Sequence, residues 1–382
     1  MNIVHVVPQL VKGGAERVMV DLANHAAGAG HQVAVVAAKK ADESLLRAEL
    51  RPEIDVRYVF DRADSRFRPY LRLLPWLLRN RKWLFAQDIV HCHLTFGSLF
   101  GALTQLIRKL SRRRGPAVVE SYQAVAAPIP RWLRWIHARL AARRDAFAIM
   151  ADDGYWGDFL KARPKLPSKI IPNGIAVPDW PAVGDEEKAR YRREIGLPQS
   201  CRFVVLTVGR VVDERRPWVF LPIFRRVADA IGPDVHFVYG GGGPASGRLL
   251  AMAAEQGLAG RVHVTGLVRN PSLPLSITDV YVTLNVGPVT GIASLEAVFS
   301  RLPVVAVQIF PGYDRGRSDW IKSDTDEAEL AADVVTLLQS PDERRQVAER
   351  QYGYAWDHLR VEVMAGAYDD LYRQAIERLS AR

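Results

Sequence analysis

Residues 285–308 read NVGPVTGIASLEAVFSRLPVVAVQ and contain the clearest strand–turn–helix pattern in the chain. A β-rich run at 279–286 ends in a Gly/Pro turn, and a short helical pattern at 291–299 precedes a second apolar strand. Such a turn places free backbone N–H groups and the positive end of a helix dipole beside a strand end, which favours an anionic ligand. Glu296 lies within this helix, where its carboxylate can accept hydrogen bonds from ribose hydroxyls. Taken alone, the segment fits equally well an ordinary strand–helix–strand unit with a solvated glutamate.

The chain is long and its composition is that of a soluble globular protein. Its 382 residues exceed what one typical core holds, so we expect two domains. No apolar run reaches the roughly 18–20 residues that a membrane-spanning helix needs. The N-terminus lacks a charged n-region and a long apolar h-region, so we interpret it as a strand and not as a signal peptide. The two cysteines, Cys92 and Cys201, have no metal-type spacing and fit a reducing cytoplasm.

The net charge of +10 is distributed unevenly. Residues 1–165 contain 27 Lys and Arg against 15 Asp and Glu, whereas the remainder contains 25 against 27. All of the basic excess therefore lies in the N-terminal half, which indicates an anionic partner such as a membrane surface, a nucleic acid or a charged substrate. The basic stretches lack the aromatic-plus-glycine signature of an RNA-binding module, so we expect no nucleic-acid partner.

Two stretches in that half interleave cations with aromatic and aliphatic residues. They are RFRPYLRLLPWLLRNRKWLFA at 66–86 and RWLRWIHARLAARR at 131–144. This composition is typical of helices that lie in the headgroup region of an anionic membrane. Amphipathic helices with a core-facing apolar side and solvated arginines are the alternative. The tryptophans expected at the membrane interface are Trp76, Trp83, Trp132 and Trp135.

The chain opens with a strand at 3–7, a glycine turn at Gly13 and Gly14, and a helix from about 15 to 27. A second strand follows at 32–38, which makes a βαβ unit with apolar strands suited to a parallel sheet covered on both faces. The glycines let the backbone approach a ligand at the N-terminus of the helix. No G-x-G-x-x-G occurs here, which argues against a dinucleotide-binding oxidoreductase.

Strands and helices continue to alternate to the end of the chain. A Pro-rich segment at 176–184 indicates a domain boundary, and a final helical region is expected at 341–379 with a break near Gly353. His91 and His93 alternate on one strand, and we expect them to face opposite ways, so that they do not both line one cleft wall. The further strands are expected at 88–93, 115–122, 169–175, 202–210, 235–243 and 261–267.

Six segments, in order and at characteristic spacing, identify a family. They are GGAERVMVDLANHAAGAGHQVAVV (13–36), IPNGI (171–175), VGRVVDERRPW (208–218), YGGGGP (239–244), RVHVTGLV (261–268) and YAWDHL (354–359). On these motifs the chain resembles, along nearly its whole length, the retaining, nucleotide-sugar-dependent glycosyltransferases of the GT-B fold, family 4. The resemblance implies an α/β protein with two Rossmann-like doubly wound domains facing a central cleft. The first, acceptor-side domain would cover 1–178, with 360–382 packing back on it, and the second, nucleotide-sugar-binding domain would cover 179–359.

The resemblance also implies where the donor is held. Arg210 stands at the family's first cation and Arg215 at its lysine position, so both are expected to hold the donor diphosphate and to act in catalysis. Arginine keeps the charge and can bind two phosphate oxygens at once, so the second replacement is mild. Glu296 corresponds to the second Glu of the family's Glu-x7-Glu motif, expected at the ribose. The other donor-binding residues implied are Gly13, Gly14, Gly241, Leu267, Thr290, Gly291 and Ile292.

Two positions depart from the family pattern. Seven residues before Glu296, where the family usually has its first Glu, this chain has Pro288. After the strand 117–119, where many members have a histidine near the reacting sugar, Tyr122 or Gln123 stands instead. These two residues and His93 are the acceptor-side residues that the resemblance implies. We interpret both departures as changes of specificity.

The implied enzyme is a hexosyltransferase that uses a UDP- or GDP-sugar and a saccharide or lipid-linked saccharide acceptor, in surface polysaccharide or glycolipid assembly. We expect no cofactor and no metal site, because the nine histidines show no H-x3-H spacing. The expected location is cytoplasmic, peripherally associated with the inner face of an anionic membrane. A nucleotide-sugar epimerase of the same fold and a catalytically inert GT-B scaffold are the alternatives. Pro288 and the missing histidine favour the inert scaffold, whereas the two arginines and Glu296 oppose it.

Overall fold

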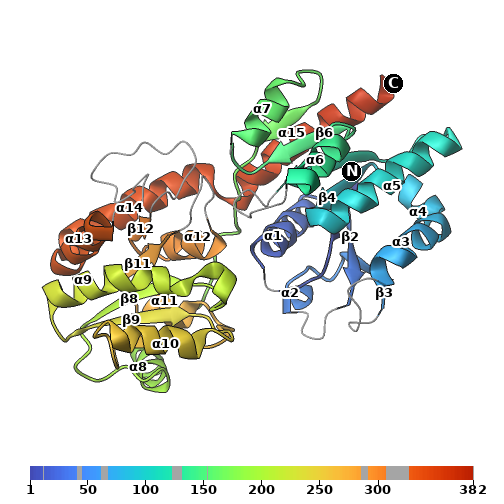
Figure 1. The fold of residues 1–382 in the computed structure, drawn as a ribbon. Helices are drawn as coiled ribbons and strands as arrows, with labels where there is room; N and C mark the ends of the chain where they lie inside the picture. The colour runs from blue at the N-terminus through green and yellow to red at the C-terminus, as the bar shows by residue number, and fades with distance from the viewer. Residues whose placement is uncertain are drawn as a thin grey trace. The chain divides into compact units, whose positions relative to one another are not determined.

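The computed structural model describes residues 1–11, 13–40, 45–61, 68–122, 131–152, 154–284, 291–306 and 327–381. The chain divides into two compact units, and each is a parallel sheet flanked by helices (Figure 1). Unit 1 holds the described residues from 1 to 176 and from 358 to 381, and unit 2 holds those from 177 to 357. None of the helices in these ranges is both long and apolar enough to cross a membrane.

Unit 1 is built on a seven-stranded parallel sheet in the order β3-β2-β1-β4-β5-β6-β7. Its central strands are buried along almost their whole length, which suits a sheet covered on both faces, although they carry some polar residues. The order reverses between β1 and β4, as in a doubly wound sheet. The strands are β1 Asn2–Val7, β2 Gln32–Lys39, β3 Asp55–Phe60, β4 Ile89–His93, β5 Ala117–Tyr122, β6 Ala146–Ile149 and β7 Ser168–Ile170.

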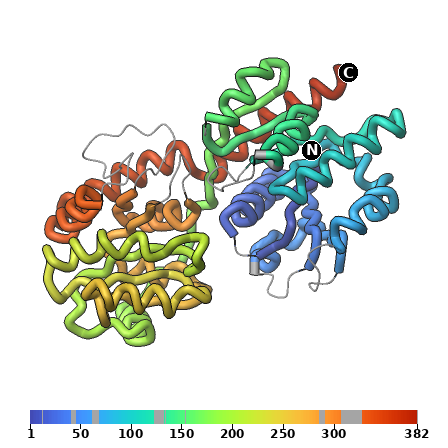
Figure 2. The backbone as a smooth tube through the Cα atoms, in the orientation of Figure 1, coloured from blue at the N-terminus to red at the C-terminus, as the bar shows by residue number. Residues whose placement is uncertain are grey.

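Helices cover both faces of this sheet. One face packs against α3 and α5 over an aliphatic and aromatic core, and the last helix, α15, packs against α1, β5 and β6 (Figure 2). The expected return of the C-terminal helix to the first domain is therefore confirmed. The helices are α1 Gly14–Gly28, α2 Leu45–Ala48, α3 Arg68–Arg79, α4 Arg81–Phe85, α5 Leu94–Ser111, α6 Arg131–Ala141, α7 Tyr155–Lys161 and α15 Val361–Ser380.

The final helical region breaks later than expected. Gly353 lies inside α14 (Pro341–His358), and the chain turns at Leu359 and Arg360. At this turn the backbone pairs with Ile175: its N–H donates to the Leu359 carbonyl (3.1 Å), and the Val361 N–H donates to its carbonyl (2.9 Å). A Cβ on the preceding Gly174 would lie 2.6 Å from the Arg360 carbonyl oxygen, so this approach requires glycine.

Unit 2 is built on a five-stranded parallel sheet in the order β10-β9-β8-β11-β12. The strands are β8 Phe203–Val208, β9 Val235–Gly240, β10 Val262–Val264, β11 Val280–Thr283 and β12 Val304–Ala306. The helical elements are α8 Asp185–Glu194, the 3-10 turns η1 Asp213–Arg215 and η2 Pro217–Phe220, α9 Leu221–Ile231, α10 Ser246–Glu255, α11 Ser272–Ser276, α12 Ile292–Phe299, α13 Glu327–Gln339 and α14. Because the strands are parallel, their carboxyl ends meet at one edge of the sheet.

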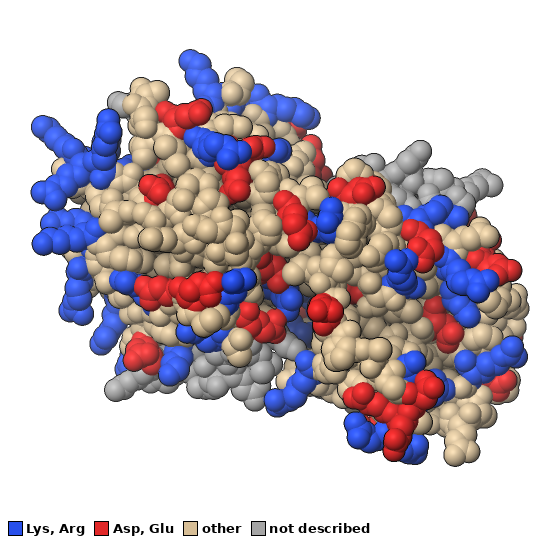
Figure 3. All heavy atoms as spheres, turned by 180° about the vertical axis from the view of Figure 1, so that it is seen from behind, with Lys and Arg blue, Asp and Glu red and all other residues tan. Residues whose placement is uncertain are grey.

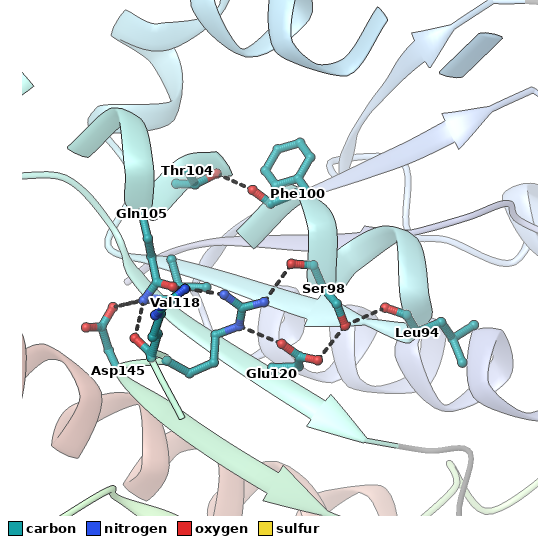
Figure 4. A network of polar contacts seen from close by, with 10 residues as sticks. Leu94, Ser98, Phe100, Thr104, Gln105, Val118, Glu120 and Asp145 are labelled. Atoms are coloured by element: carbon teal, nitrogen blue, oxygen red, sulfur yellow. Dashed lines mark hydrogen bonds and ion pairs between the residues drawn. The ribbon is translucent and has the colours of Figure 1, made fainter. Parts of the chain in front are cut away.

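A buried ion pair ties α5 to the sheet of unit 1 (Figure 4). The Arg144 guanidinium is fully buried and donates to the Glu120 carboxylate at 2.5 Å. It also donates to the Gln105 side-chain oxygen at 2.9 Å and to the Ser98 carbonyl at 2.6 Å, while the Ser98 hydroxyl donates to Glu120. Every charge here is hydrogen-bonded, which is the condition under which a buried pair is tolerated.

The tryptophans of the two basic stretches divide between core and surface. Trp76 and Trp83 pack edge-to-face at 6.3 Å against the core under α3 and α5, and the Arg57 guanidinium covers Trp83. Both are partly buried against this core, so the expectation that they lie at a membrane interface stays a prediction. Trp132 and Trp135 are more than half exposed.

Candidate active site

The two arginines implied by the resemblance lie just past the carboxyl end of β8. Arg210 follows Gly209 directly, and Arg215 closes the 3-10 turn η1. Both side chains are exposed, and neither forms a hydrogen bond or ion pair with another described residue. The nearby Asp213 carboxylate pairs instead with Arg248 at 3.3 Å. Two cations without an internal partner at a sheet edge are suited to an anionic ligand.

The glycine run after β9 packs against the loop that bears these arginines. A Cβ on Gly241 would lie 2.1 Å from the Gly209 carbonyl oxygen, and one on Gly243 would lie 2.2 Å from the Val211 carbonyl oxygen. The Val211 N–H donates to the Gly242 carbonyl at 3.0 Å. The glycines are therefore needed where the two loops touch, and this contact holds the backbone beside Arg210 in one conformation.

The next loop along the edge, after β10, is joined to the same run. The Thr265 hydroxyl accepts a hydrogen bond from the Gly241 N–H at 3.1 Å and donates to the Gly266 carbonyl. Leu267 follows and is 58% exposed. Thr265 is a residue that sequence reasoning missed, because its role depends on the pairing of β9 with β10 and not on a local motif.

Helix α12 follows β11, and β11 pairs with β8 on the side opposite β9. Gly291 is its N-cap, with no side-chain cap, so N–H groups of the first turn, including that of Ile292, have no side-chain acceptor among the described residues. Glu296 is half-buried on this helix. Burial raises the pKa of the adjacent Tyr281 hydroxyl, and the Glu296 carboxylate raises it further. Thr290, Pro288 and Gln123 lie outside the described residues.

In unit 1, Gly13 is the N-cap of α1 after the end of β1. The Glu16 carboxylate lies against it, so that a Cβ on Gly13 would be 2.3 Å from its oxygen. Arg17 and Asp21, one turn further on, form an ion pair at 3.0 Å. The predicted phosphate-facing turn of Gly13 and Gly14 thus has a carboxylate in its first turn.

The histidines of β4 lie on one face of the strand, and the expectation that they face opposite ways is wrong. Residues two apart on a strand share a face, so the ring centroids of His91 and His93 lie 4.0 Å apart, with the rings tilted by 39°. His5 on β1 joins them, with its Nδ1 3.1 Å from His93 Nε2. One ring nitrogen from each of the three histidines lies within 4.8 Å of the other two, and the H-x3-H criterion does not find this cluster because it spans two strands.

These histidines form a buried hydrogen-bond network with α15. His91 contacts the Tyr372 hydroxyl at 2.7 Å and the Ser121 hydroxyl at 2.5 Å, and Ser121 contacts the Tyr368 hydroxyl at 2.7 Å. Burial lowers the pKa of His5 to about 3 and holds the pKa of His91 well below its usual value. We therefore interpret the cluster as neutral imidazoles that hold α15 on the sheet.

Tyr122, expected on the acceptor side, points to the face of β5 opposite the one from which Ser121 contacts His91. Its ring packs 4.5 Å from that of Trp156 in a small buried cluster with Phe147. This environment gives Tyr122 a clear packing role. His93, at the carboxyl end of β4, is also buried.

Comparisons with known proteins agree with this architecture. The family described as Glycosyltransferase Family 4 matches residues 12–177, and Glycosyl transferases group 1 matches residues 202–340. The alpha-D-kanosaminyltransferase of Streptomyces kanamyceticus is 28% identical over 72% of this chain and 75% of its own length. The 2-deoxystreptamine glucosyltransferase of that organism is 29% identical over 52% of each chain. The structure of HepE from Anabaena in complex with UDP-glucose is 18% identical, covers 100% of both chains and has a TM-score of 0.75, which shows a common fold.

Proposed function

We propose, since this chain belongs to glycosyltransferase family 4 and has the GT-B fold, that it transfers a hexosyl group from a nucleoside diphosphate sugar to an acceptor hydroxyl with retention of the anomeric configuration. The main support is the carboxyl edge of the unit 2 sheet. There, two arginines without an internal partner, a glycine-lined loop and the first turn of α12 stand at the ends of neighbouring strands.

The leaving diphosphate is the group that this edge stabilises. When the bond between the anomeric carbon and the diphosphate oxygen breaks, its electron pair moves onto the diphosphate. Arg210 and Arg215 would hold that growing charge, with N–H groups of the α12 first turn adding further donors. The acceptor oxygen then bonds to the anomeric carbon on the same face, and its proton passes to a diphosphate oxygen. This route requires no dedicated protein base.

Glu296 would bind the ribose of the donor. It lies in the second turn of α12, and its carboxylate can accept hydrogen bonds from two neighbouring hydroxyls. The nucleobase would lie by the loop after β10, where Thr265 fixes the backbone and exposed Leu267 offers an apolar surface. We propose UDP- and GDP-sugars as donors and a saccharide or lipid-linked saccharide of surface polysaccharide or glycolipid assembly as the acceptor.

The surface of unit 1 supports a lipid-linked acceptor. On α3, Leu71, Leu74 and Leu78 are exposed at helical spacing and form one stripe. Lys and Arg side chains gather where α3, α4 and the end of α5 lie, at the left margin of Figure 3. We propose that this surface binds an anionic membrane at its cytoplasmic face, with the leucine stripe in the headgroup region. The exposed basic residues around it are Arg68, Arg72, Arg79, Arg81, Lys82, Lys109, Arg112, Arg113 and Arg114.

A donor panel tests the reaction. The protein is incubated with UDP- and GDP-sugars and candidate acceptors, and products are identified by mass spectrometry, with the new linkage assigned by NMR. Transfer with retained configuration is expected for one nucleotide class. Interconversion of the donor sugar without an acceptor would identify an epimerase instead, and absence of nucleotide binding would contradict the proposal.

Flotation with lipid vesicles tests the membrane surface. We expect binding to anionic vesicles at low salt, release at high salt, and loss of binding in a Leu71→Gln, Leu74→Gln, Leu78→Gln variant. Leu250→Gln, which changes an exposed leucine of unit 2, is the control. A native protein that stays unbound at low salt would leave a soluble acceptor as the better assignment.

A further inference from the structure

Arg216, immediately after Arg215, has an unusual backbone conformation. Its φ of 47° and ψ of 56° are left-handed, a region that disfavours residues with a Cβ. Two other arginines of the described chain have positive φ, Arg112 and Arg301. Arg112 is the C-cap of α5 and Arg301 follows the C-cap of α12, positions where left-handed residues are common. Arg216 is the C-cap of η1 and at the same time the N-cap of η2, so it joins two 3-10 turns.

The turn at Arg216 is fixed by its neighbours. The Arg216 N–H donates to the Asp213 carbonyl at 3.0 Å, and the Val219 N–H donates to the Arg216 carbonyl at 3.1 Å. Pro217 is buried, and its carbonyl accepts a hydrogen bond of 2.9 Å from the Tyr239 hydroxyl of β9. The backbone conformation is therefore imposed by packing, and the side chain is not needed to produce it.

The Arg216 side chain has no structural partner in the part of the chain that the structure describes. It is exposed and forms no hydrogen bond, ion pair or ring contact with another described residue. Asp213, three residues earlier in the chain, is paired with Arg248, whose guanidinium also covers the Trp218 ring at 4.2 Å. Glu214 is exposed on the same turn, so the segment from Arg210 to Arg216 has three cations and two carboxylates, one of them already paired.

We propose that Arg216 is a third cation of the diphosphate site and sets its preference for a diphosphate over a monophosphate. The inference rests on the proposed function, because it places the donor diphosphate at Arg210 and Arg215. A left-handed arginine at a turn that glycine would satisfy has a conformational cost, and its side chain makes no internal contact that offsets this cost. A contact with phosphate oxygens would offset it.

Calorimetric titration with UDP, GDP and the matching monophosphates tests the proposal. Arg216→Gly should weaken binding of the preferred nucleoside diphosphate at least tenfold, weaken the monophosphate less, and leave the thermal midpoint unchanged or higher. Arg216→Lys should retain most of the affinity because it keeps the charge. Arg226→Ala, which removes an exposed arginine on α9 of the same unit, should not alter nucleotide binding.

The outcomes separate this inference from the proposed function. If Arg216→Gly binds the diphosphate as tightly as the native protein while Arg210→Ala binds it weakly, the role of Arg216 is refuted and the donor site stands. If neither change affects binding, both are refuted. Arg216→Asn, which tolerates the left-handed region, replaces the glycine variant if the latter unfolds.

Discussion

Arg144 in unit 1 and Arg210 in unit 2 show two opposite uses of one side chain. The Arg144 guanidinium is fully buried, and its donors bind Glu120, Gln105 and the Ser98 carbonyl. Arg210 is exposed at a sheet edge and has no partner among the described residues. A cation whose donors are all used inside the fold contributes to stability, whereas one left without a partner is available to a ligand. The same substitutions should therefore alter different properties in the two places.

Glu120→Gln should have the largest effect, and it should be on stability. Removing the carboxylate leaves Arg144 buried without a countercharge, which costs about 3–5 kcal/mol of unfolding free energy. Urea or guanidinium titration followed by circular dichroism measures it. Glu349→Gln makes the same change in the exposed pair with Arg301 and should cost at most about 1 kcal/mol. Equal losses of unfolding free energy at the two positions would contradict the conclusion that burial makes the Glu120–Arg144 pair essential for stability.

Arg210→Ala and Arg215→Ala should each reduce turnover while the unfolding free energy stays the same. Each arginine supplies a charge-assisted contact of about 1.5–3 kcal/mol to the leaving diphosphate, which corresponds to a roughly 10- to 150-fold loss in kcat/KM. Initial rates with the donor found in the panel measure it. Arg226→Ala, an exposed arginine on α9 of the same unit, is the control. Unchanged turnover in both variants would refute the assignment of these residues.

The histidine cluster of unit 1 should make stability fall as the pH is lowered from 7 to 5. His5 faces His91 and His93, and burial lowers its pKa to about 3. In the unfolded chain it takes up a proton near pH 6.5, while the folded protein stays neutral, so His5 alone contributes a loss of about 2 kcal/mol over this range.

Denaturation of the native protein and of His5→Asn at several pH values measures this contribution. The unfolding free energy of the variant should fall less steeply between pH 7 and 5 than that of the native protein. His236 in unit 2, whose pKa is lowered to about 4 chiefly by burial, should behave similarly in His236→Asn. Stability that does not change between pH 7 and 5 would show that the histidines are not buried as neutral groups.

Glu296→Gln should have the smallest effect, on nucleotide affinity. The amide keeps one acceptor oxygen but loses the charge, so binding of the free nucleoside diphosphate should weaken by about 1 kcal/mol, or roughly fivefold. Calorimetry measures it, with thermal unfolding as the check on folding. Affinity equal to that of the native protein would place Glu296 away from the ribose.

Much of the architecture was predictable from the sequence because its signals are local. Buried parallel strands are short apolar runs, and the breaks between them are glycines and prolines, so β1, β2, β8 and β9 were expected within a few residues of where they lie. The family also followed from motifs that are contiguous in the chain. The shared face of His91 and His93 is also predictable from the sequence, because residues two apart on a strand always point to the same side.

The sequence alone determined the two-unit α/β organisation, the family and the arginines at the end of β8, because each depends on residues close together in the chain. Tertiary structure decided the partners of the buried polar groups. His5 meets His91 and His93 only through the register of β1 with β4, and His91 meets Tyr372 only because α15 returns to the first sheet. Glu120 on β5 meets Arg144, which lies just before β6, because β5 pairs with β6. Such contacts join residues from 24 to 281 positions apart, and no local pattern specifies them.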